Sequence, residues 1–139
     1  MTVKEFRIQL ALGSLSNDVK EEVAGNLNTC KGILTILSKD KDWWVKWRVA
    51  GNISTPKEVL TVLSKDKNWG IREEVAGNIS TPVKVLNKLS RDKDWTVRYN
   101  IARNPNTPKE VLIILSSDKN QSAEYSTASS TDTFKETLT

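Results

Sequence analysis

The sequence contains no histidine and only one cysteine, Cys30, so it lacks most of the side chains that enzymes use for catalysis. Without an imidazole no Ser-His-Asp or Cys-His arrangement can form, and one cysteine supplies neither an intramolecular disulfide nor a cysteine-rich metal site. Glycine-rich phosphate loops and carboxylate clusters with metal-ligand spacing are also missing. We therefore predict a protein that is not an enzyme and that has no catalytic residues, metal or cofactor.

Long apolar segments are missing as well. No stretch of about 18 apolar residues occurs, so no membrane-spanning helix is expected. The N-terminal residues include the acidic Glu5 and have no long apolar core before a small-residue cleavage site, unlike a secretory signal peptide. We expect a cytoplasmic protein that does not bind membranes.

Internal repetition is the strongest feature that the sequence does contain. Alanine, asparagine and leucine return at an interval of 26 residues, and residues 41–66 are the clearest copy. The recurring positions are Ala24, Ala50, Ala76 and Ala102; Asn26, Asn52, Asn78 and Asn104; Leu34, Leu60, Leu86 and Leu112; and Leu37, Leu63, Leu89 and Leu115. Such self-similarity is typical of stacked supersecondary units, each burying its apolar face against its neighbours.

The first half of each copy predicts a helix. It opens at an N-cap residue whose side chain can accept a bond from a free helical N–H group. Val45, Val49 and Ala50 then give one buried helical stripe. We predict that the recurring asparagine ends this helix and that its amide bonds backbone groups of its own turn or the next. The N-cap column consists of Ser16, Asp42, Asn68 and Asp94.

The second half of each copy predicts another helix with a sharp start. Thr55, Pro56 and Glu58 fit the N-cap, N1 and N3 positions, which is the arrangement of a capping box. Leu60 and Leu63 are then expected to be the buried side chains of this helix.

The chain is therefore predicted to be one all-α domain over residues 1–139, a solenoid of two-helix repeats. Residues 119–139 align with the repeat as a degenerate C-terminal copy, whose polar replacements stop the stack from continuing into another molecule. Residues 1–14 are expected to form an N-terminal cap helix that uses Phe6, Ile8, Leu10 and Leu12. The four repeats span residues 15–40, 41–66, 67–92 and 93–118.

Residues 95–118 resemble the repeat of the bacterial leucine-rich repeat variant family. The family pattern VR..VA.NP.TP.E.L..L..D is met by Val97-Arg98, Ile101-Ala102, Asn104-Pro105, Thr107-Pro108, Glu110, Leu112, Leu115 and Asp118. The resemblance implies a right-handed α-solenoid, with 3₁₀ character in some second helices or turns, that binds other macromolecules. The interval here is slightly longer than the family's, and the Asn-Pro pair is Asn-Leu or Asn-Ile in three copies. Some family members carry an iron–sulfur cluster, which this single-cysteine chain is not expected to hold.

The charge distribution permits a nucleic-acid partner without favouring one. Residues 41–66 and residues 67–92 each carry five basic and three acidic groups, which gives +2 for each. Residues 15–40 carry three basic and four acidic groups, which gives −1. Dedicated nucleic-acid binders usually concentrate lysine and arginine more heavily on one face.

Binding residues are expected where the repeats differ, because the repeated columns form the scaffold. Trp44 and Trp47 are three residues apart and share a helix face, and Arg48 lies one turn from Trp44. A tryptophan pair beside an arginine has the composition of an interface hot spot, and Tyr99 occupies the column of Trp47. The alternative is that these rings lie flat on neighbouring helices as outer packing.

Arg72 and Arg98 belong to a basic column that starts with Lys20 and Lys46. The column either presents a basic line to a partner or bonds helix-end carbonyls and the aspartates of the connectors. These alternatives lead to two functional hypotheses. The first is a protein-binding or peptide-binding module that uses the aromatic residues. The second is a nucleic-acid-binding module that follows phosphates with Lys46, Arg48, Arg72 and Arg98.

Overall fold

A computed structural model of the chain describes residues 1–117. This part of the chain is all helical and contains nine α-helices and no strand. The 3₁₀ character expected for some helices is therefore wrong for these nine. The degenerate repeat predicted at residues 119–139 lies outside the described residues. The helices are α1 (Val3–Ala11), α2 (Asn17–Gly25), α3 (Lys31–Leu37), α4 (Trp43–Gly51), α5 (Lys57–Leu63), α6 (Trp69–Gly77), α7 (Val83–Leu89), α8 (Trp95–Arg103) and α9 (Lys109–Leu115).

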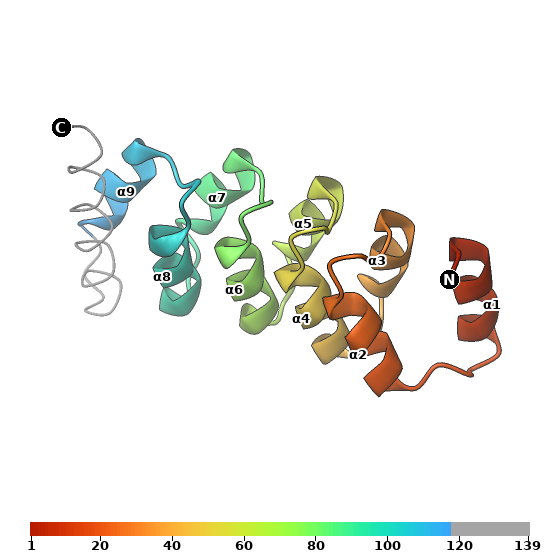
Figure 1. The fold of residues 1–139 in the computed structure, drawn as a ribbon. Coiled ribbons are helices and arrows are strands. Elements are labelled where there is room, and N and C mark those ends of the chain that lie inside the picture. Colours follow the sequence, from red (N-terminus) through yellow and green to blue (C-terminus); the bar gives the residue numbers. More distant parts are fainter. Residues whose placement is uncertain (118–139) are drawn as a thin grey trace.

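The helices form two rows (Figure 1). In the first row α2, α4, α6 and α8 each pack along the next, and these are the most extensive helix–helix contacts in the described chain. In the second row α1, α3, α5, α7 and α9 lie farther apart, and most of their contacts are with first-row helices. The first-row helices begin at residues 17, 43, 69 and 95, which is the interval of the sequence pattern.

The core contains the stripes that the sequence predicts. Val45, Val49 and Ala50 of α4 have no exposed surface, and Leu60 and Leu63 of α5 are buried against them in one continuous cluster. The predicted N-cap residues also perform that role. The side-chain oxygens of Ser16, Asp42, Asn68 and Asp94 accept hydrogen bonds from the amides of Val19, Trp44, Gly70 and Thr96.

The capping box predicted for the second-row helices is wrong. The N-cap residue of α5 is Pro56, and its side chain makes no capping bond. Thr55 instead donates its hydroxyl to the carbonyl of Val49, at a distance of 2.7 Å, and Thr29, Thr81 and Thr107 do the same in their copies. The hydroxyl is a second donor to a carbonyl at the end of the preceding helix, which also accepts the backbone amide of Asn52. Threonine therefore closes the turn between the two helices.

The N-terminal helix buries a different stripe from the one expected. Phe6 is fully buried, and Val3 and Leu10 pack against the core, whereas Ile8 and Leu12 are exposed. Val3, Phe6 and Leu10 are three and four residues apart and so share one face of α1. Ile8 and Leu12 lie on the opposite face of a helix of nine residues, so their alignment with the repeat did not predict their burial.

The asparagines at the ends of the first-row helices form a ladder. Asn52 donates its side-chain amide to the carbonyls of Ala24 and Asn26, and Asn78 and Asn104 repeat the arrangement one and two helices later. The side-chain oxygen of Asn52 accepts the amide of Ser54. The predicted bonding role is confirmed. The backbone at these positions is extended, with φ near −80°, and no residue of the described chain other than Gly13 has a positive φ.

Candidate interaction surface

Trp44 and Trp47 form a stacked pair on α4. Their ring centroids are 4.7 Å apart and their planes differ by only 5°. Trp43 meets the edge of Trp44 at 4.9 Å, which extends the pair to three rings. The two rings are placed differently, because Trp47 is half-buried and packs against the core, whereas Trp44 is 39% exposed. Trp47 therefore fits the outer-packing alternative, whereas the side chain of Trp44 is exposed to solvent.

The next helix of the row leaves room for Trp47. Residue 70 of α6 is glycine, and the Cδ1 atom of Trp47 lies 3.9 Å from the point where a Cβ on that residue would stand. A larger side chain at residue 70 would compete with the indole for this space. The sequence column that holds Trp44 in α4 thus holds a glycine in α6, and that difference allows Trp47 to lie across the helix–helix junction.

Three further tryptophans lie on the same outer face of the first row. Trp43 is 48% exposed, Trp69 is 50% exposed and Trp95 is 41% exposed. These three tryptophans recur at the 26-residue interval and were not among the predicted binding residues. The helical period contained the signal, since a residue two positions before the buried Val45 points about 200° away from the buried stripe.

Tyr99 is placed at the far end of this aromatic face. It lies on α8, two helices away from α4 in the row, so the structure does not bring it into contact with Trp44. The edge of its ring faces Trp95, with centroids 6.3 Å apart. Arg103 lies over the ring, 5.5 Å from the centroid, and donates to the phenol oxygen. The sequence pattern did not predict this contact between Arg103 and Tyr99.

Arg48 lies back across α2. Its Nε donates to the carbonyl of Glu21, at a distance of 3.5 Å. Its guanidinium occupies the space where a side chain on Gly25 would begin, since a Cβ there would stand 2.7 Å from it. A side chain on Gly25 would therefore displace the guanidinium, and Arg48 is an exposed part of the face.

The prediction that Arg72 belongs to an interaction surface is wrong. Arg72 is only 7% exposed and makes a two-point ion pair with Asp92, with bonds of 2.8 and 3.1 Å. Its third nitrogen donates to the carbonyls of Asp66 and Lys67. Burial of an arginine costs free energy, and hydrogen bonds and an ion pair of this kind offset that cost. Arg72 therefore joins α6 to two connectors and is not available to a partner.

The other members of the basic column follow the same pattern. Lys20 pairs with Asp40 at 3.0 Å and Lys46 pairs with Asp66 at 2.9 Å. Burial alone would raise the pKa of Asp66, but hydrogen bonds from Lys46 and from a backbone amide outweigh it, so the pKa lies below its usual value. Arg98 donates to the carbonyl of Asp92, at a distance of 2.7 Å. The basic column therefore bonds the connector aspartates and backbone carbonyls, which is the alternative to presenting a basic line to a partner.

The carboxylate of Glu74 is the least satisfied charge near the tryptophan pair. Glu74 is half-buried, and its Oε2 lies 2.6 Å from the point where a Cβ on Gly51 would stand, over the end of α4. Burial and the neighbouring charge of Glu73 raise the pKa of Glu74, and burial also raises the pKa of Glu73. Glu74 is therefore not a freely solvated surface residue.

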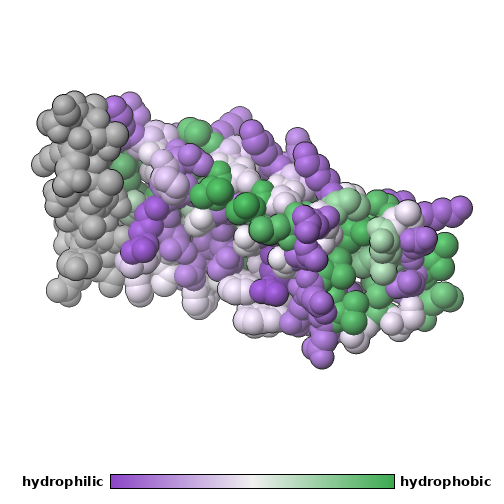
Figure 2. Space-filling view, viewed as in Figure 1, coloured by the Kyte–Doolittle hydropathy of each residue, from purple (hydrophilic) through white to green (hydrophobic). Residues whose placement is uncertain are grey.

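A second apolar feature lies on the turns between the two rows. Leu27, Ile53 and Ile79 occupy one sequence column, and about half of each side chain is exposed. Figure 2 shows apolar atoms gathered across the middle of this view of the molecule. An open groove of about 520 Å³ includes Leu27 and Ile53 among its lining residues, beside Lys57 and Glu58. No aromatic side chain lines this groove.

The described residues show neither a metal-binding group nor a membrane-spanning helix. Over residues 1–117 no group of three or more His, Cys, Asp or Glu side chains could hold a metal ion. Within the same range no helix is long and apolar enough to cross a membrane. Comparisons with known protein families, with curated proteins and with solved structures find no match.

Proposed function

We propose that the chain is a right-handed α-solenoid of 26-residue repeats, of the kind formed by leucine-rich repeat variant proteins, and that it is a non-enzymatic module that binds a protein or peptide. The asparagine ladder and the regular helix starts support the repeat architecture. The binding role rests on one observation. All five tryptophans of the chain lie on the first-row helices, and four of them are at least 39% exposed.

An exposed tryptophan is costly to keep in water unless another surface covers it. Contiguous exposed apolar surface on a protein marks an interaction site, and tryptophan is enriched among the residues that dominate binding energy. The binding surface in this proposal, the tryptophan face, consists of Trp43, Trp44, Trp47, Trp69 and Trp95.

The nucleic-acid hypothesis has less support. Phosphate binding needs cations that are available at the surface. Lys20, Lys46 and Arg72 are each paired with an aspartate, so most of the predicted basic line is neutralised within the molecule. We therefore expect that neither duplex DNA nor single-stranded DNA binds the protein at low salt.

A selection from a displayed library of random peptides tests the proposed function. Peptides selected on the wild-type chain should lose binding to the Trp44→Ala variant by about tenfold or more. Val62→Ala is the matched control, because Val62 is an exposed apolar residue of α5 in the other row, and it should leave binding unchanged. Circular dichroism should show the same helix content in all three proteins. Selected peptides that bind all three equally would contradict the proposal.

A further inference from the structure

The charges at the outward positions of the first-row helices are predominantly acidic, although the chain as a whole carries +4. Five carboxylates and two guanidiniums belong to the outward positions of the first-row helices. The carboxylates are Asp18, Glu21, Glu22, Glu73 and Glu74, and the guanidiniums are Arg48 and Arg103. Both arginines are exposed, and their guanidiniums lie against the molecule, since one donates to the Glu21 carbonyl and the other lies over Tyr99.

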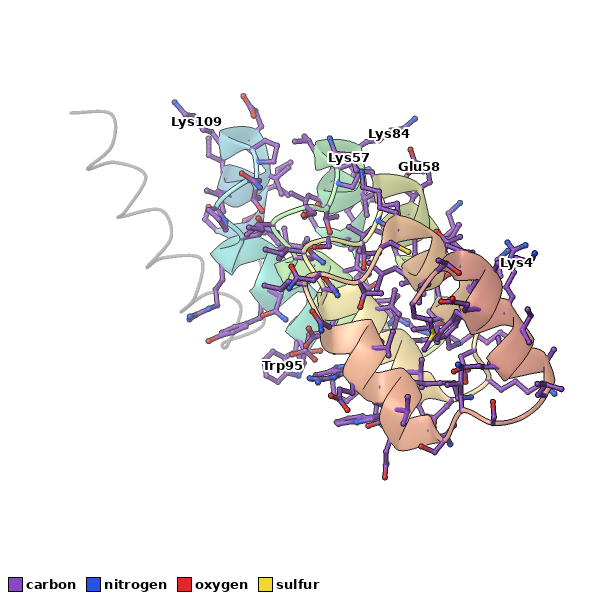
Figure 3. The ribbon with its side chains drawn as sticks, turned by 45° about the vertical axis from the view of Figure 1, so that its right-hand side comes forward. Lys4, Lys57, Glu58, Lys84, Trp95 and Lys109 are labelled. Atoms are coloured by element: carbon purple, nitrogen blue, oxygen red, sulfur yellow. The ribbon has the colours of Figure 1, made fainter. Side chains whose placement is uncertain are left out.

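A second set of lysines lies on the opposite side of the molecule. Figure 3 shows Trp95 on the side of the first row, while Lys57, Lys84 and Lys109 project from the opposite side, which belongs to the second row. These three lysines are exposed. The second-row side is therefore basic, whereas the tryptophan side carries the carboxylates of the first-row helices together with exposed Lys41, Lys67 and Lys93 at the starts of those helices.

The register of the row places two of the carboxylates at the Trp44–Trp47 stack. Neighbouring positions on successive helices are 23 residues apart, as Gly25 with Arg48, Trp47 with Gly70 and Gly51 with Glu74 show. The same interval places Glu21 of α2 beside Trp44. On the other side, the Glu74 carboxylate lies over Gly51, one helical turn beyond Trp47. The stack thus has a carboxylate from α2 on one side and a carboxylate from α6 on the other.

Resting on the proposed binding function, we infer that the partner is a basic peptide segment and that a lysine or arginine side chain of this segment lies on the Trp44–Trp47 stack between Glu21 and Glu74. Aromatic faces attract cations through the ring quadrupole, and tryptophan does so best among the aromatic side chains. Glu74 has no hydrogen-bond or ion-pair partner among the described residues, so a partner cation would satisfy a charge that the fold leaves half-buried and unpaired.

The chain's own C-terminal residues do not have the chemistry of this partner. Residues 118–139 contain four acidic and two basic side chains, which gives −2. A segment of that charge would be repelled by the carboxylates of the tryptophan face. The occupant is therefore a separate, positively charged chain.

The test uses two fluorescently labelled peptides, one of alternating lysine and alanine and one of alternating glutamate and alanine, whose binding to the full chain is followed by anisotropy. The lysine peptide should bind although both molecules are positively charged. Glu74→Gln should weaken its binding about two- to fivefold, as expected for one exposed charge pair. Arg48→Gln should strengthen it, because the variant removes a cation from the face. Glu58→Gln, an exposed glutamate of the second row, should leave it unchanged.

The outcomes separate this inference from the proposed function. If the glutamate peptide binds instead and loses binding in Trp44→Ala, the tryptophan face is a docking surface but its partner is not basic. If the lysine peptide does not bind, or binds wild type and Glu74→Gln equally, the inference is overturned. If, in addition, the peptide library yields no Trp44-dependent binder, the proposed function fails with it.

Discussion

The side-chain amide of Asn78 donates a 2.7 Å hydrogen bond to the backbone carbonyl of Ala50, one helix earlier in the row. The same amide donates to the carbonyl of Asn52, so one side chain satisfies two carbonyls at the end of α4. Such carbonyls have no partner within their own helix. The first row is therefore held together by polar bonds at its helix ends as well as by apolar packing.

Replacing Asn78 with alanine should lower the free energy of unfolding by about 2–4 kcal/mol, because the carbonyl of Ala50 loses its side-chain donor and the carbonyl of Asn52 keeps only the amide of Thr55. Asn26→Ala is the matched control. Asn26 is exposed and lies on the first helix of the row, so its side chain reaches no earlier helix and only accepts the amide of Asn28. The control should cost about 1 kcal/mol or less. Urea unfolding followed by circular dichroism measures both, and equal losses would contradict the ladder's role.

The buried ion pair gives a second prediction. Arg72→Met should destabilise the protein by about 3–5 kcal/mol, because Asp92 remains buried without its cation. Lys20→Met breaks the equivalent pair with Asp40, which is more exposed and has a single bond, so its cost should be about 1–2 kcal/mol. Chemical denaturation compares the two variants. A larger loss in Lys20→Met would show that the Arg72 network contributes less than its geometry implies.

The two stacked tryptophans should differ in their effect on stability. Trp47→Ala removes a ring that packs against the core and over Gly70, and should cost about 2–4 kcal/mol. Trp44→Ala removes a more exposed ring and should cost less than about 1.5 kcal/mol. Thermal and urea unfolding of the single variants separates these effects. Equal costs would mean that Trp44 is also part of the packing, and would weaken its assignment to a binding surface.

Glu74 should make stability depend on pH. Its pKa is raised in the folded state by burial and by Glu73, so the folded protein binds this proton more tightly than the unfolded chain does. Ionisation of Glu74 therefore lowers the free energy of unfolding above its folded pKa, and the penalty disappears as the pH falls below the ordinary value of 4.5. Glu74→Gln should be more stable than wild type at about pH 7, and the difference should shrink at about pH 3.5.

Urea unfolding at the two pH values measures this difference. Glu58→Gln serves as the control, since Glu58 is exposed on α5. Its stability should differ from wild type by less than about 0.5 kcal/mol at either pH. A destabilised Glu74→Gln at neutral pH would reveal that the carboxylate is satisfied in solution by a group that the described residues do not show.

The glycines that end the first-row helices should respond differently to alanine. A Cβ on Gly77 would meet only atoms 3.9 Å or more away, so Gly77→Ala should stabilise the protein by about 0.4–1 kcal/mol through the unfolded state. A Cβ on Gly25 would collide with the Arg48 guanidinium at 2.7 Å, so Gly25→Ala should gain less or should destabilise. Differential scanning calorimetry compares them, and an equal gain in both would mean that Arg48 is not held against Gly25.

Much of the fold could be predicted from the sequence because the residues that specify each helix lie close together within one repeat. N-cap residues, the i and i+4 spacing of Val45 and Val49, and the recurrence of alanine and asparagine depend on helical geometry alone. Some of the expectations that were wrong concerned groups with two possible partners. Thr55 can cap the helix that follows it or bond the helix that precedes it, and only the path of the turn selects the second.

The sequence by itself determined that the described part of the chain is helical, where the first-row helices begin and which of their faces are buried, because these properties follow from the spacing of residues along one helix. Only the tertiary structure decided the fate of side chains that lie between helices. It turned Arg72 inward onto Asp92 and left Glu74 half-buried over Gly51. It also placed Trp47 over Gly70 and left Trp44 exposed beside it. Those outcomes depend on contacts between residues about 20 or more positions apart, and the pattern within a single repeat contains no information on that distance.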